Sequence, residues 1–405
     1  MEEIEIQKII DAIEDYYWLP LYNYLSKNPE LIKTFPAFLL SPEMITLHIG
    51  KTHIGVEYSG KETTNKLPTS SLLNVTYQDL TLSDSNYLEE IIGFKYDSSV
   101  DKNISLPLPQ YSDDWVLPTN RGLDKLVELR WNWMAQNSII GINCFIFHVE
   151  EGKFTRLING RFYDSDDSGL KTRYIKWIDF IPIEINPFEN DLYEFKIKIN
   201  ELAKHVQHDA HFIFPLPHKD DFKYNKLPQL NRFIELLGNE ETSEPQITQF
   251  LEATENRFIL TMAFLGKEIF PQILCEWQSE TKNSIKPDFF IEKPNGYCDI
   301  VEFKLPELKT KTVVGKVNRE TFSAEINSYI SQTRVYKEYF EDPNNRTWIK
   351  DNYDITVRYP RRTLIIGRRW NFSSEEWKKI IEDYTDIDIL TYDDLIDGVM
   401  SQFYM

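Results

Sequence analysis

The chain has 405 residues, 41% of them hydrophobic and 27% charged, a balance that excludes a largely disordered or fibrous protein and predicts two or three domains. The net charge of −19 disfavours a general nucleic-acid-binding surface, because phosphate binding relies on Lys and Arg. The acidic first residues and the lack of a long apolar run predict neither a secretory leader nor a membrane span, and therefore a cytoplasmic protein.

Residues 1–235 are predicted to be a mixed α/β region of one or two subdomains. Isoleucines from Ile4 to Ile13 recur at helical spacing, and residues 44–60 alternate like a β-hairpin. Residues 70–118 are rich in Ser, Asp and Pro, which indicates long connections. A helical pattern over 123–136 and apolar strand patterns over 139–150, 174–185 and 192–202 complete this region. It contains no recognisable motif, so we expect a sensing, binding or assembly role.

Four of the seven histidines lie within fourteen residues: His205, His208, His211 and His218. Imidazole is a common zinc ligand, so this group is a possible metal site. The spacing drifts around a helix, however, and residues 211–218 have the pattern of a strand or loop. We therefore do not assign zinc to it. The three cysteines, Cys144, Cys275 and Cys298, form no zinc-type pair.

A second domain is expected over residues 236–405, after a charged, proline-closed linker at 238–245. Residues 247–266 have the pattern of one helix, and residues 269–277 that of a strand. Two further strands, 286–293 and 297–305, are joined by Pro-Asn-Gly, a strong hairpin signal. A long helix over 318–342 and a buried strand over 361–369 follow. The predicted order is α-β-β-β-α-β, with a helix from Ser373 and a final segment over 389–400.

Charge is unevenly distributed along the chain. Between Lys286 and Trp370 there are 16 basic and 12 acidic residues, so this segment is locally positive in an acidic protein. Such segregation confines a polyanion to one segment and repels it from the remainder. The strong overall acidity therefore does not exclude a nucleic-acid partner for the second domain.

The candidate chemistry lies in the predicted hairpin. Side chains alternate along a strand, so Glu302 and Lys304 share one face, while Asp299 lies on the other and is assigned a structural role. Asp288, at the start of the partner strand, joins them across the hairpin. Carboxylates and a backbone carbonyl are hard oxygen ligands that suit Mg²⁺ or Mn²⁺, so we assign Asp288, Glu302 and the carbonyl of Phe303 to the metal.

Lys304 is expected to orient or deprotonate an attacking water and to neutralise developing charge. The next predicted helix adds Gln332 and Tyr336, which lie four residues apart and so share one helix face. An isolated Glu-x-Lys is usually a solvated strand face. It is the pairing across the hairpin and the following helix that favour a catalytic site.

This segment resembles the PD-(D/E)xK nuclease superfamily. Pro287, Asp288, Glu302 and Lys304 match its metal motif, and Gln332 with Tyr336 matches the Q-x-x-x-Y motif of its RecB-like branch. The runs FLEATENRF, PDFFIEKPNGYCDIVEFKLP, LIIGR and ILTYDDL, within residues 246–399, are similar to the Shedu family of antiphage defence nucleases.

The resemblance implies an α/β (α+β) fold with a nuclease core, and an endonuclease or nickase that uses Mg²⁺ or Mn²⁺ on double-stranded DNA, including phage DNA. It also implies a homo-oligomer, with a tetramer as the candidate assembly. The superfamily often adds a glutamate from its first helix to the metal site. Glu252 and Glu255 are both candidates here, and the sequence does not choose between them.

Basic residues around the site are candidates for DNA-backbone contacts, which give affinity without base reading. These basic residues are Lys309, Lys311, Lys316, Arg319 and Arg334, and Tyr336 is a further candidate for DNA contact. The arginines that flank the last core strand, Arg361, Arg362, Arg368 and Arg369, are assigned to subunit contacts instead. The alternative to an enzyme is a non-catalytic module with a nuclease-like fold that captures DNA or DNA ends.

Overall fold

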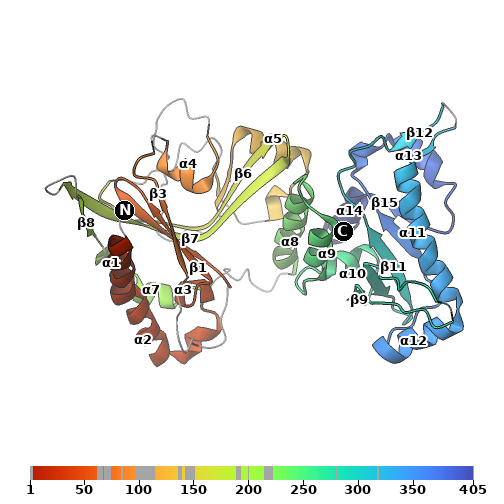
Figure 1. The fold of residues 1–405 in the computed structure, drawn as a ribbon, viewed down its shortest axis with the longest axis horizontal. Helices are drawn as coiled ribbons and strands as arrows, with labels where there is room; N and C mark the ends of the chain where they lie inside the picture. The colour runs from red at the N-terminus through yellow and green to blue at the C-terminus, as the bar shows by residue number, and fades with distance from the viewer. Residues whose placement is uncertain are drawn as a thin grey trace. The chain divides into compact units, whose positions relative to one another are not determined.

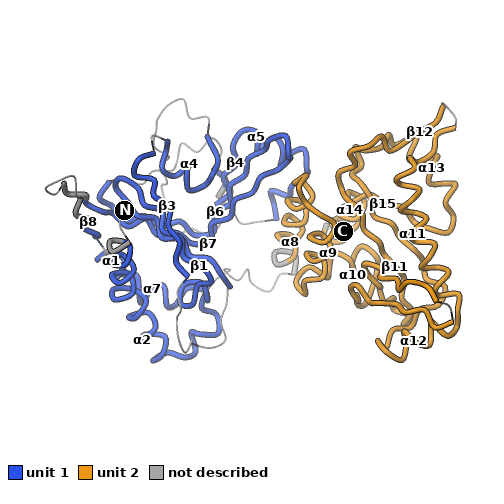
Figure 2. Tube along the Cα trace, viewed as in Figure 1, with its two compact units in different colours: residues 1–221 blue, residues 222–405 orange. Residues whose placement is uncertain are grey.

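The computed structural model describes residues 3–61, 67, 74–83, 85–96, 115–135, 139–141, 151–187, 193–198, 200–213, 222–279, 281–316 and 319–404. The chain divides into two compact units, residues 1–221 and residues 222–405 (Figures 1 and 2). We call them the N-terminal and the C-terminal unit. The division lies fourteen residues before the predicted end of the first region at 235, so the helix over 222–237 is counted with the C-terminal unit.

The described part of the N-terminal unit contains short helices and a large sheet. The helices are α1 (Glu3–Ile13), η1 (Glu14–Trp18), α2 (Leu19–Lys27), η2 (Pro29–Lys33), α3 (Ala37–Leu40), α4 (Tyr87–Ile92), α5 (Asn120–Glu128), η3 (Trp133–Ala135), α6 (Asn200–Lys204) and α7 (Val206–Ala210). The strands are β1 (Met44–Ile49), β2 (His53–Ser59), β3 (Val75–Asp79), β4 (Trp115–Pro118), β5 (Ile139–Ile140), β6 (Thr155–Asp166), β7 (Gly169–Pro187) and β8 (Tyr193–Ile197).

These strands form one mixed sheet in the order β3-β1-β2-β7-β6-β4-β5, with β8 paired to β7. Side chains of β7 enter two hydrophobic cores, one on each face of the sheet. Trp177 and Ile181 pack with α1 and α2, whereas Ile178 and Phe180 pack with α4. The predicted hairpin over 44–60 is confirmed as the antiparallel pair β1–β2. The long connection predicted over 70–118 is wrong in part, because β3, α4 and β4 lie within it.

A closed polar cluster is buried in this unit. Arg156 of β6 donates from Nε and Nη2 to the two oxygens of Asp179, at 2.5 and 3.1 Å, and from Nη1 to Asp209 at 2.8 Å. The hydroxyl of Tyr17 donates to the second oxygen of Asp209 at 2.7 Å. The guanidinium also lies 4.4 Å from the ring of Trp177. The cluster ties η1, two strands and α7 together.

The C-terminal unit is built around a smaller sheet. Its helices are α8 (Phe222–Leu237), α9 (Glu244–Glu252), α10 (Phe258–Ala263), α11 (Ala324–Glu341), α12 (Pro343–Tyr353), η4 (Arg369–Asn371), α13 (Ser374–Ile381) and α14 (Tyr392–Tyr404). Its strands are β9 (Glu268–Pro271), β10 (Phe289–Glu292), β11 (Cys298–Phe303), β12 (Val313–Val314), β13 (Thr321–Phe322), β14 (Arg362–Ile365) and β15 (Asp388–Leu390).

Five of these strands form a sheet in the order β15-β14-β11-β10-β9, within the described residues. Strands β9, β10 and β11 are antiparallel neighbours, and β14 and β15 run parallel to β11. On one face, Phe290 and Ile300 pack against Tyr336 and Phe340 of α11. On the other, Phe303 contacts Tyr392, which in turn contacts Phe233 of α8. Helices therefore cover both faces, and the prediction of a mixed α/β protein is confirmed.

The expected order of elements is present, from α10 through β9, β10, β11 and α11 to β14, with the small pair β12–β13 inserted before α11. The single helix predicted over 247–266 is instead two helices, α9 and α10. Asn256 donates to the carbonyl of Phe250 at 2.8 Å and Arg257 to that of Glu252 at 3.0 Å. These side chains satisfy the last carbonyls of α9, so the helix ends there.

The predicted linker at 238–245 is a tight turn between α8 and α9. Thr242 donates to the carbonyl of Leu236, and Ser243 with Gln246 forms a capping box at the start of α9. Phe233 and Phe250 stack across the turn, with ring centres 5.7 Å apart. Among the described residues, no helix combines the length and the apolar character that a bilayer crossing requires.

Candidate active site

The β10–β11 hairpin brings Asp288 and Glu302 to one end of the C-terminal sheet. Phe289 pairs with Val301 in the antiparallel register, which sets Asp288, one residue earlier, opposite Glu302. Asp288 accepts a hydrogen bond from the backbone N–H of Phe303 at 2.8 Å. Directly opposite residues of a sheet share a face, so both carboxylates lie on the side that α11 covers.

Glu302 is 3% exposed and accepts hydrogen bonds on both oxygens. Its Oε1 receives Lys304 Nζ at 3.0 Å and Gln332 Nε2 at 2.8 Å, and its Oε2 receives the hydroxyl of Tyr336 at 3.0 Å. The carboxylate is therefore held by its own strand and by α11. These contacts place four of the residues expected from the sequence in one network.

Lys304 is 7% exposed, which is unusual for a lysine. Its ammonium lies 3.0 Å from Glu302 and 3.4 Å from Glu244. Burial disfavours its charge, but Glu302, Glu244 and Asp288 together raise the pKa of Lys304 above its usual value. The lysine is thus a cation enclosed by acids, with its backbone carbonyl accepting from the hydroxyl of Tyr392 at 2.5 Å.

The carboxyl group of Asp288 has a strongly raised pKa. Burial, followed by the nearby charge of Glu302, raises the pKa of Asp288 to about 7, against the opposing effects of the Phe303 N–H and of Lys304. One of its oxygens, Oδ2, carries the bond from Phe303; no bond to Oδ1 is recorded within the described residues. Asp288 therefore has an oxygen that can bind a further group, and it is only partly ionised near neutral pH.

The glutamate that contacts the site from the first helix is Glu244, the first residue of α9. Glu252 and Glu255, the two residues expected there, are exposed, and no contact recorded in the described residues joins either side chain to Asp288, Glu302 or Lys304. Glu244 precedes the predicted start of the helix at 247, whereas Glu252 and Glu255 lie at and after the observed end of α9. No pattern in the sequence singled out Glu244 as the glutamate of the site.

Helix α11 presents one face to the site. Gln332 and Tyr336, one turn apart, also bond to each other at 3.2 Å. Tyr336 is 4% exposed and holds Glu302, so the prediction that it contacts DNA is corrected. Burial and then Glu302 raise the pKa of Tyr336, and its hydroxyl remains a donor. Arg334 lies exposed on another side of the helix.

Phe303, whose carbonyl we expect at the metal, presents its ring to the opposite face. The ring contacts Phe289 and Tyr392, with centre distances of 5.7 and 5.9 Å. Asp299 lies on this opposite face as well: it accepts from the backbone N–H of Arg361 at 2.9 Å and pairs with Lys293 at 3.6 Å. Asp299 and Glu302 therefore lie on opposite faces of β11, as the alternation of side chains along a strand predicts.

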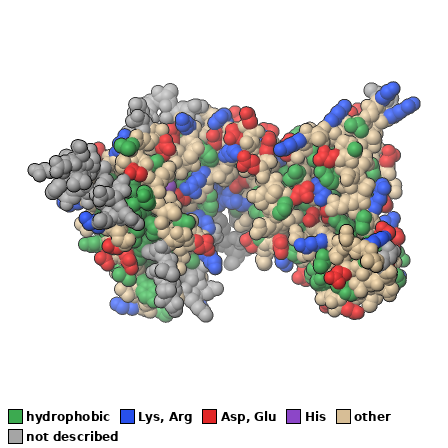
Figure 3. Space-filling view, in the orientation of Figure 1, with side chains coloured by type: hydrophobic (Ala, Val, Ile, Leu, Met, Phe, Trp, Pro, Cys, Tyr) green, Lys and Arg blue, Asp and Glu red, His purple; other side chains and the backbone are tan. Residues whose placement is uncertain are grey.

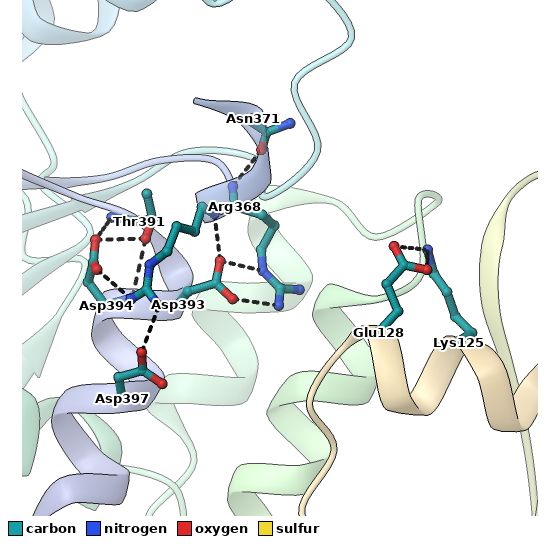
Figure 4. Close-up of polar contacts among 9 residues, drawn as sticks. Lys125, Glu128, Arg368, Asn371, Thr391, Asp393, Asp394 and Asp397 are labelled. Carbon is teal, nitrogen blue, oxygen red and sulfur yellow. Dashed lines mark hydrogen bonds and ion pairs between the residues drawn. The ribbon is translucent and has the colours of Figure 1, made fainter. Parts of the chain in front are cut away.

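The start of α14 anchors the peptide of Lys304 through Tyr392, and a dense polar network holds that helix start in place (Figure 4). Arg368 is 1% exposed and bonds to both oxygens of Asp393, at 3.0 and 2.9 Å. Arg369 pairs with Asp394 and Asp397 at 2.7 and 2.9 Å.

The four arginines that the sequence assigns to subunit contacts all form ion pairs within the C-terminal unit. Arg362 is 1% exposed and bonds to Thr333 and Asp386, and Arg361 pairs with Asp388. Because Arg362 and Arg368 are buried, they cannot reach another subunit in this structure, and their assignment is corrected. They join β14 to the helices around it.

The remaining basic candidates lie on exposed backbone after β11. Lys309, Lys311, Lys316 and Arg319 are all exposed on the segment that connects β11 to α11, which includes the β12–β13 pair. We call residues 305–320 the basic segment. Basic side chains project from the region of this pair in the space-filling view (Figure 3).

The histidine tract is engaged in other contacts. His205 is buried and stacks on Phe154 with ring centres 5.1 Å apart. The ring of His208 lies 3.2 Å from Asp209, and that of His211 lies 3.2 Å from the Tyr24 hydroxyl. His218 lies outside the described residues.

The donor set of the site fits a hard divalent cation. Asp288, Glu302 and Glu244 place three carboxylates around one lysine, and Oδ1 of Asp288 accepts no hydrogen bond within the described residues. Carboxylate oxygens are the ligands that Mg²⁺ and Mn²⁺ prefer. Chemically, the arrangement can hold such a cation next to a buried, positively charged lysine.

One comparison with known proteins bears on this unit. Residues 241–396 match the family model described as Shedu protein SduA, C-terminal. They are a domain of that type, and the resemblance seen in the sequence is confirmed for this part of the chain. Among curated proteins, none matches the chain. The matched range includes Glu244, the hairpin, the basic segment and the start of α14.

Proposed function

We propose that the C-terminal unit, a domain of the Shedu antiphage defence family, is a metal-dependent endonuclease that hydrolyses phosphodiester bonds of double-stranded DNA. The observation that carries the proposal is the buried contact of Lys304 with Glu302 at 3.0 Å, on the face where Asp288 stands opposite. This is the acid–acid–lysine set of PD-(D/E)xK nucleases, and the order of elements around it supports assigning the unit to that superfamily.

Each residue has a distinct part in the proposal. Asp288, Glu302 and the carbonyl of Phe303 would hold Mg²⁺ or Mn²⁺, and Glu244 contacts Lys304 from the start of α9. The cation would polarise the phosphoryl oxygen and lower the pKa of a bound water. Gln332 and Tyr336 hold Glu302 by donating to its two oxygens.

Lys304 would orient the attacking water and stabilise the negative charge that develops on phosphate. Its acidic neighbours raise its pKa and so keep it protonated at neutral pH. A protonated lysine cannot act as a general base, so charge stabilisation and orientation are the roles that its surroundings favour. This narrows the two roles that the sequence left open for the residue.

The DNA would be held by the basic segment and by Arg334. Lys309, Lys311, Lys316 and Arg319 are exposed and lie within 15 residues of Lys304 in the chain. Phosphate contacts from such side chains give affinity and register but no base reading. A homo-oligomer, which the family resemblance implies, and control of DNA recognition or activation by residues 1–235 are further parts of the proposal.

The test is cleavage of supercoiled plasmid DNA with Mg²⁺ or Mn²⁺. We expect nicking or linearisation by the natural chain, and a loss of about 10²- to 10⁴-fold in Lys304→Ala and Asp288→Asn. Lys286→Ala is the matched control, because Lys286 is an exposed lysine of the same hairpin that bonds to Gln272. Equal cleavage by Lys304→Ala and the natural chain would remove this site from the mechanism.

The alternative, a non-catalytic module that captures DNA or DNA ends, has its own signature in the same assay. It predicts no cleavage with any divalent metal, together with DNA binding that persists in EDTA. The structure offers no observation that favours it over an enzyme, since each residue of the acid–acid–lysine set is present.

A further inference from the structure

Tyr329 is an aromatic residue of α11 that lies beside Lys304. It precedes Gln332 by three residues and Tyr336 by seven, spacings that keep all three on the helix face turned to the site. Its ring centre is 5.6 Å from the ammonium of Lys304, within the range of a cation–π contact. No role was expected for it from the sequence.

Lys304 has three partners that approach from different elements. Glu302 comes from its own strand, Glu244 from the start of α9, and Tyr329 from α11. A lysine side chain has four rotatable bonds and a point charge, so acids alone attract it without fixing its direction. The ring of Tyr329 closes a further side and limits the positions that the ammonium can take.

The ring of Tyr329 is itself held in place. Its hydroxyl donates to Glu325 Oε1 at 2.9 Å, one turn earlier on α11. Glu325 Oε2 accepts from the hydroxyl of Thr310 at 2.5 Å, and Thr310 lies between Lys309 and Lys311 in the basic segment. Leu308 and Tyr329 also pack against the same hydrophobic cluster. The segment and the helix thus fix the tyrosine together.

We propose that Tyr329 is a positioning residue that holds the ammonium of Lys304 over its ring and so directs it into the site. This inference rests on the proposed function, because it gives the position of Lys304 a catalytic purpose. It assigns the tyrosine ring, rather than its hydroxyl, as the group that acts on the lysine. The packing of the ring on the hydrophobic cluster beside Leu308 holds it in place, and the bond of the hydroxyl to Glu325 is secondary.

Two substitutions separate the ring from the hydroxyl. Tyr329→Phe keeps the ring and removes the bond to Glu325, whereas Tyr329→Leu keeps an apolar side chain and removes the ring. We expect kcat for DNA cleavage to fall about tenfold in the leucine variant, with little change in KM, and to recover in the phenylalanine variant. Tyr353→Leu, a partly exposed tyrosine on α12, is the control for general effects of such a change.

A second readout does not require activity. The protein is labelled with ¹³C at the ε-carbons of its lysines, and its NMR spectrum is recorded. The signal that disappears in Lys304→Gln belongs to Lys304. An aromatic ring beside the ammonium shifts this signal from the position that is ordinary for lysine. We expect this shift in the natural chain and in Tyr329→Phe, and its loss in Tyr329→Leu. An unchanged Lys304 signal in Tyr329→Leu, or unchanged kcat in that variant, would overturn the proposal. If the natural chain cuts no DNA, the proposed function fails while the spectrum still decides whether Tyr329 positions Lys304.

Discussion

Both units bury a cluster of acids around one cation, and the two clusters differ in how completely the acids are matched. In the N-terminal unit, Arg156 and Tyr17 supply a donor to each of the four carboxylate oxygens of Asp179 and Asp209. In the C-terminal unit, Lys304 faces three carboxylates, and no bond to Asp288 Oδ1 is recorded among the described residues.

The two clusters differ in the geometry of the cation as well as in the number of hydrogen-bond donors. A guanidinium offers five N–H donors in a rigid fork and can satisfy two carboxylates at once, whereas an ammonium is a point charge with three. Burial raises the pKa of Asp179 and of Asp288 alike. A perturbed acid therefore does not by itself mark a functional site. The spare carboxylate oxygen of Asp288 is what distinguishes the C-terminal cluster.

The largest effect on stability is expected from opening the closed cluster. Arg156→Met leaves two buried carboxylates without their cation and should lower the free energy of unfolding by about 3–5 kcal/mol. Arg121→Met is the matched control, because Arg121 is 67% exposed and its pair with Asp164 should contribute at most about 1 kcal/mol. Thermal unfolding of both variants measures the contrast. Equal losses would mean that the buried cluster does not hold the N-terminal unit together.

Divalent metal should stabilise the open cluster and leave the closed one unchanged. At Mg²⁺ or Mn²⁺ a hundredfold above its Kd, the C-terminal unit should gain about 2.7 kcal/mol. Asp288→Asn should abolish the gain, and Asp299→Asn, on the opposite face of the same sheet, should retain it. Binding needs ionised Asp288, so the gain should increase as pH rises through about 7. A gain that survives in Asp288→Asn would place the metal elsewhere.

Without metal, Asp288→Asn should stabilise the protein at pH 8. The folded pKa of about 7 lies above the ordinary value of 3.8, so the folded state keeps the proton that the unfolded state has lost between these values. The wild-type protein therefore loses stability as pH rises from about 4 to about 7, and a neutral side chain escapes this loss. We expect a gain on the order of 1 kcal/mol at pH 8 and none near pH 4. Chemical denaturation at both pH values measures it.

The smallest effect concerns the basic segment. Replacing Lys309 and Lys311 by alanine should reduce the slope of log K against log salt for DNA binding by about two, roughly one for each phosphate contact. At saturating DNA, kcat should change little. The matched control replaces Lys378 and Lys379, which lie on α13 outside the basic segment, by alanine. This double substitution should leave the slope unchanged. The prediction fails if both pairs have the same effect.

The sequence predicted the parts of the site that depend on local periodicity. Alternation along β11 separates Glu302 from Asp299, and helical spacing joins Gln332 to Tyr336; both relations hold in the structure. The Asn-Gly turn identified the hairpin that carries Asp288. These features follow from the periods of strands and helices, which are local properties.

The contacts that the sequence did not predict depend on tertiary structure. Glu244 reaches Lys304 because the first residue of α9 lies 3.4 Å from that ammonium, a contact between segments that are sixty residues apart in the chain. Strand β6 was missed although it is long. It contains Asn159-Gly160, a pair typical of turns, and here Asn159 has φ of +54° at a break in the pairing with β7. Strand β3 is mostly exposed and lies at the sheet edge, so its polar sequence resembled a loop.

The most direct test of the account is the position of a bound metal. Crystals of the natural chain grown with Mn²⁺ and a short DNA duplex would locate the ion by its anomalous scattering. We predict an anomalous peak between the carboxylates of Asp288 and Glu302, with the ammonium of Lys304 directed at the phosphate beside it. A protein that cuts DNA with Mn²⁺ but binds the ion away from these two carboxylates would contradict the account.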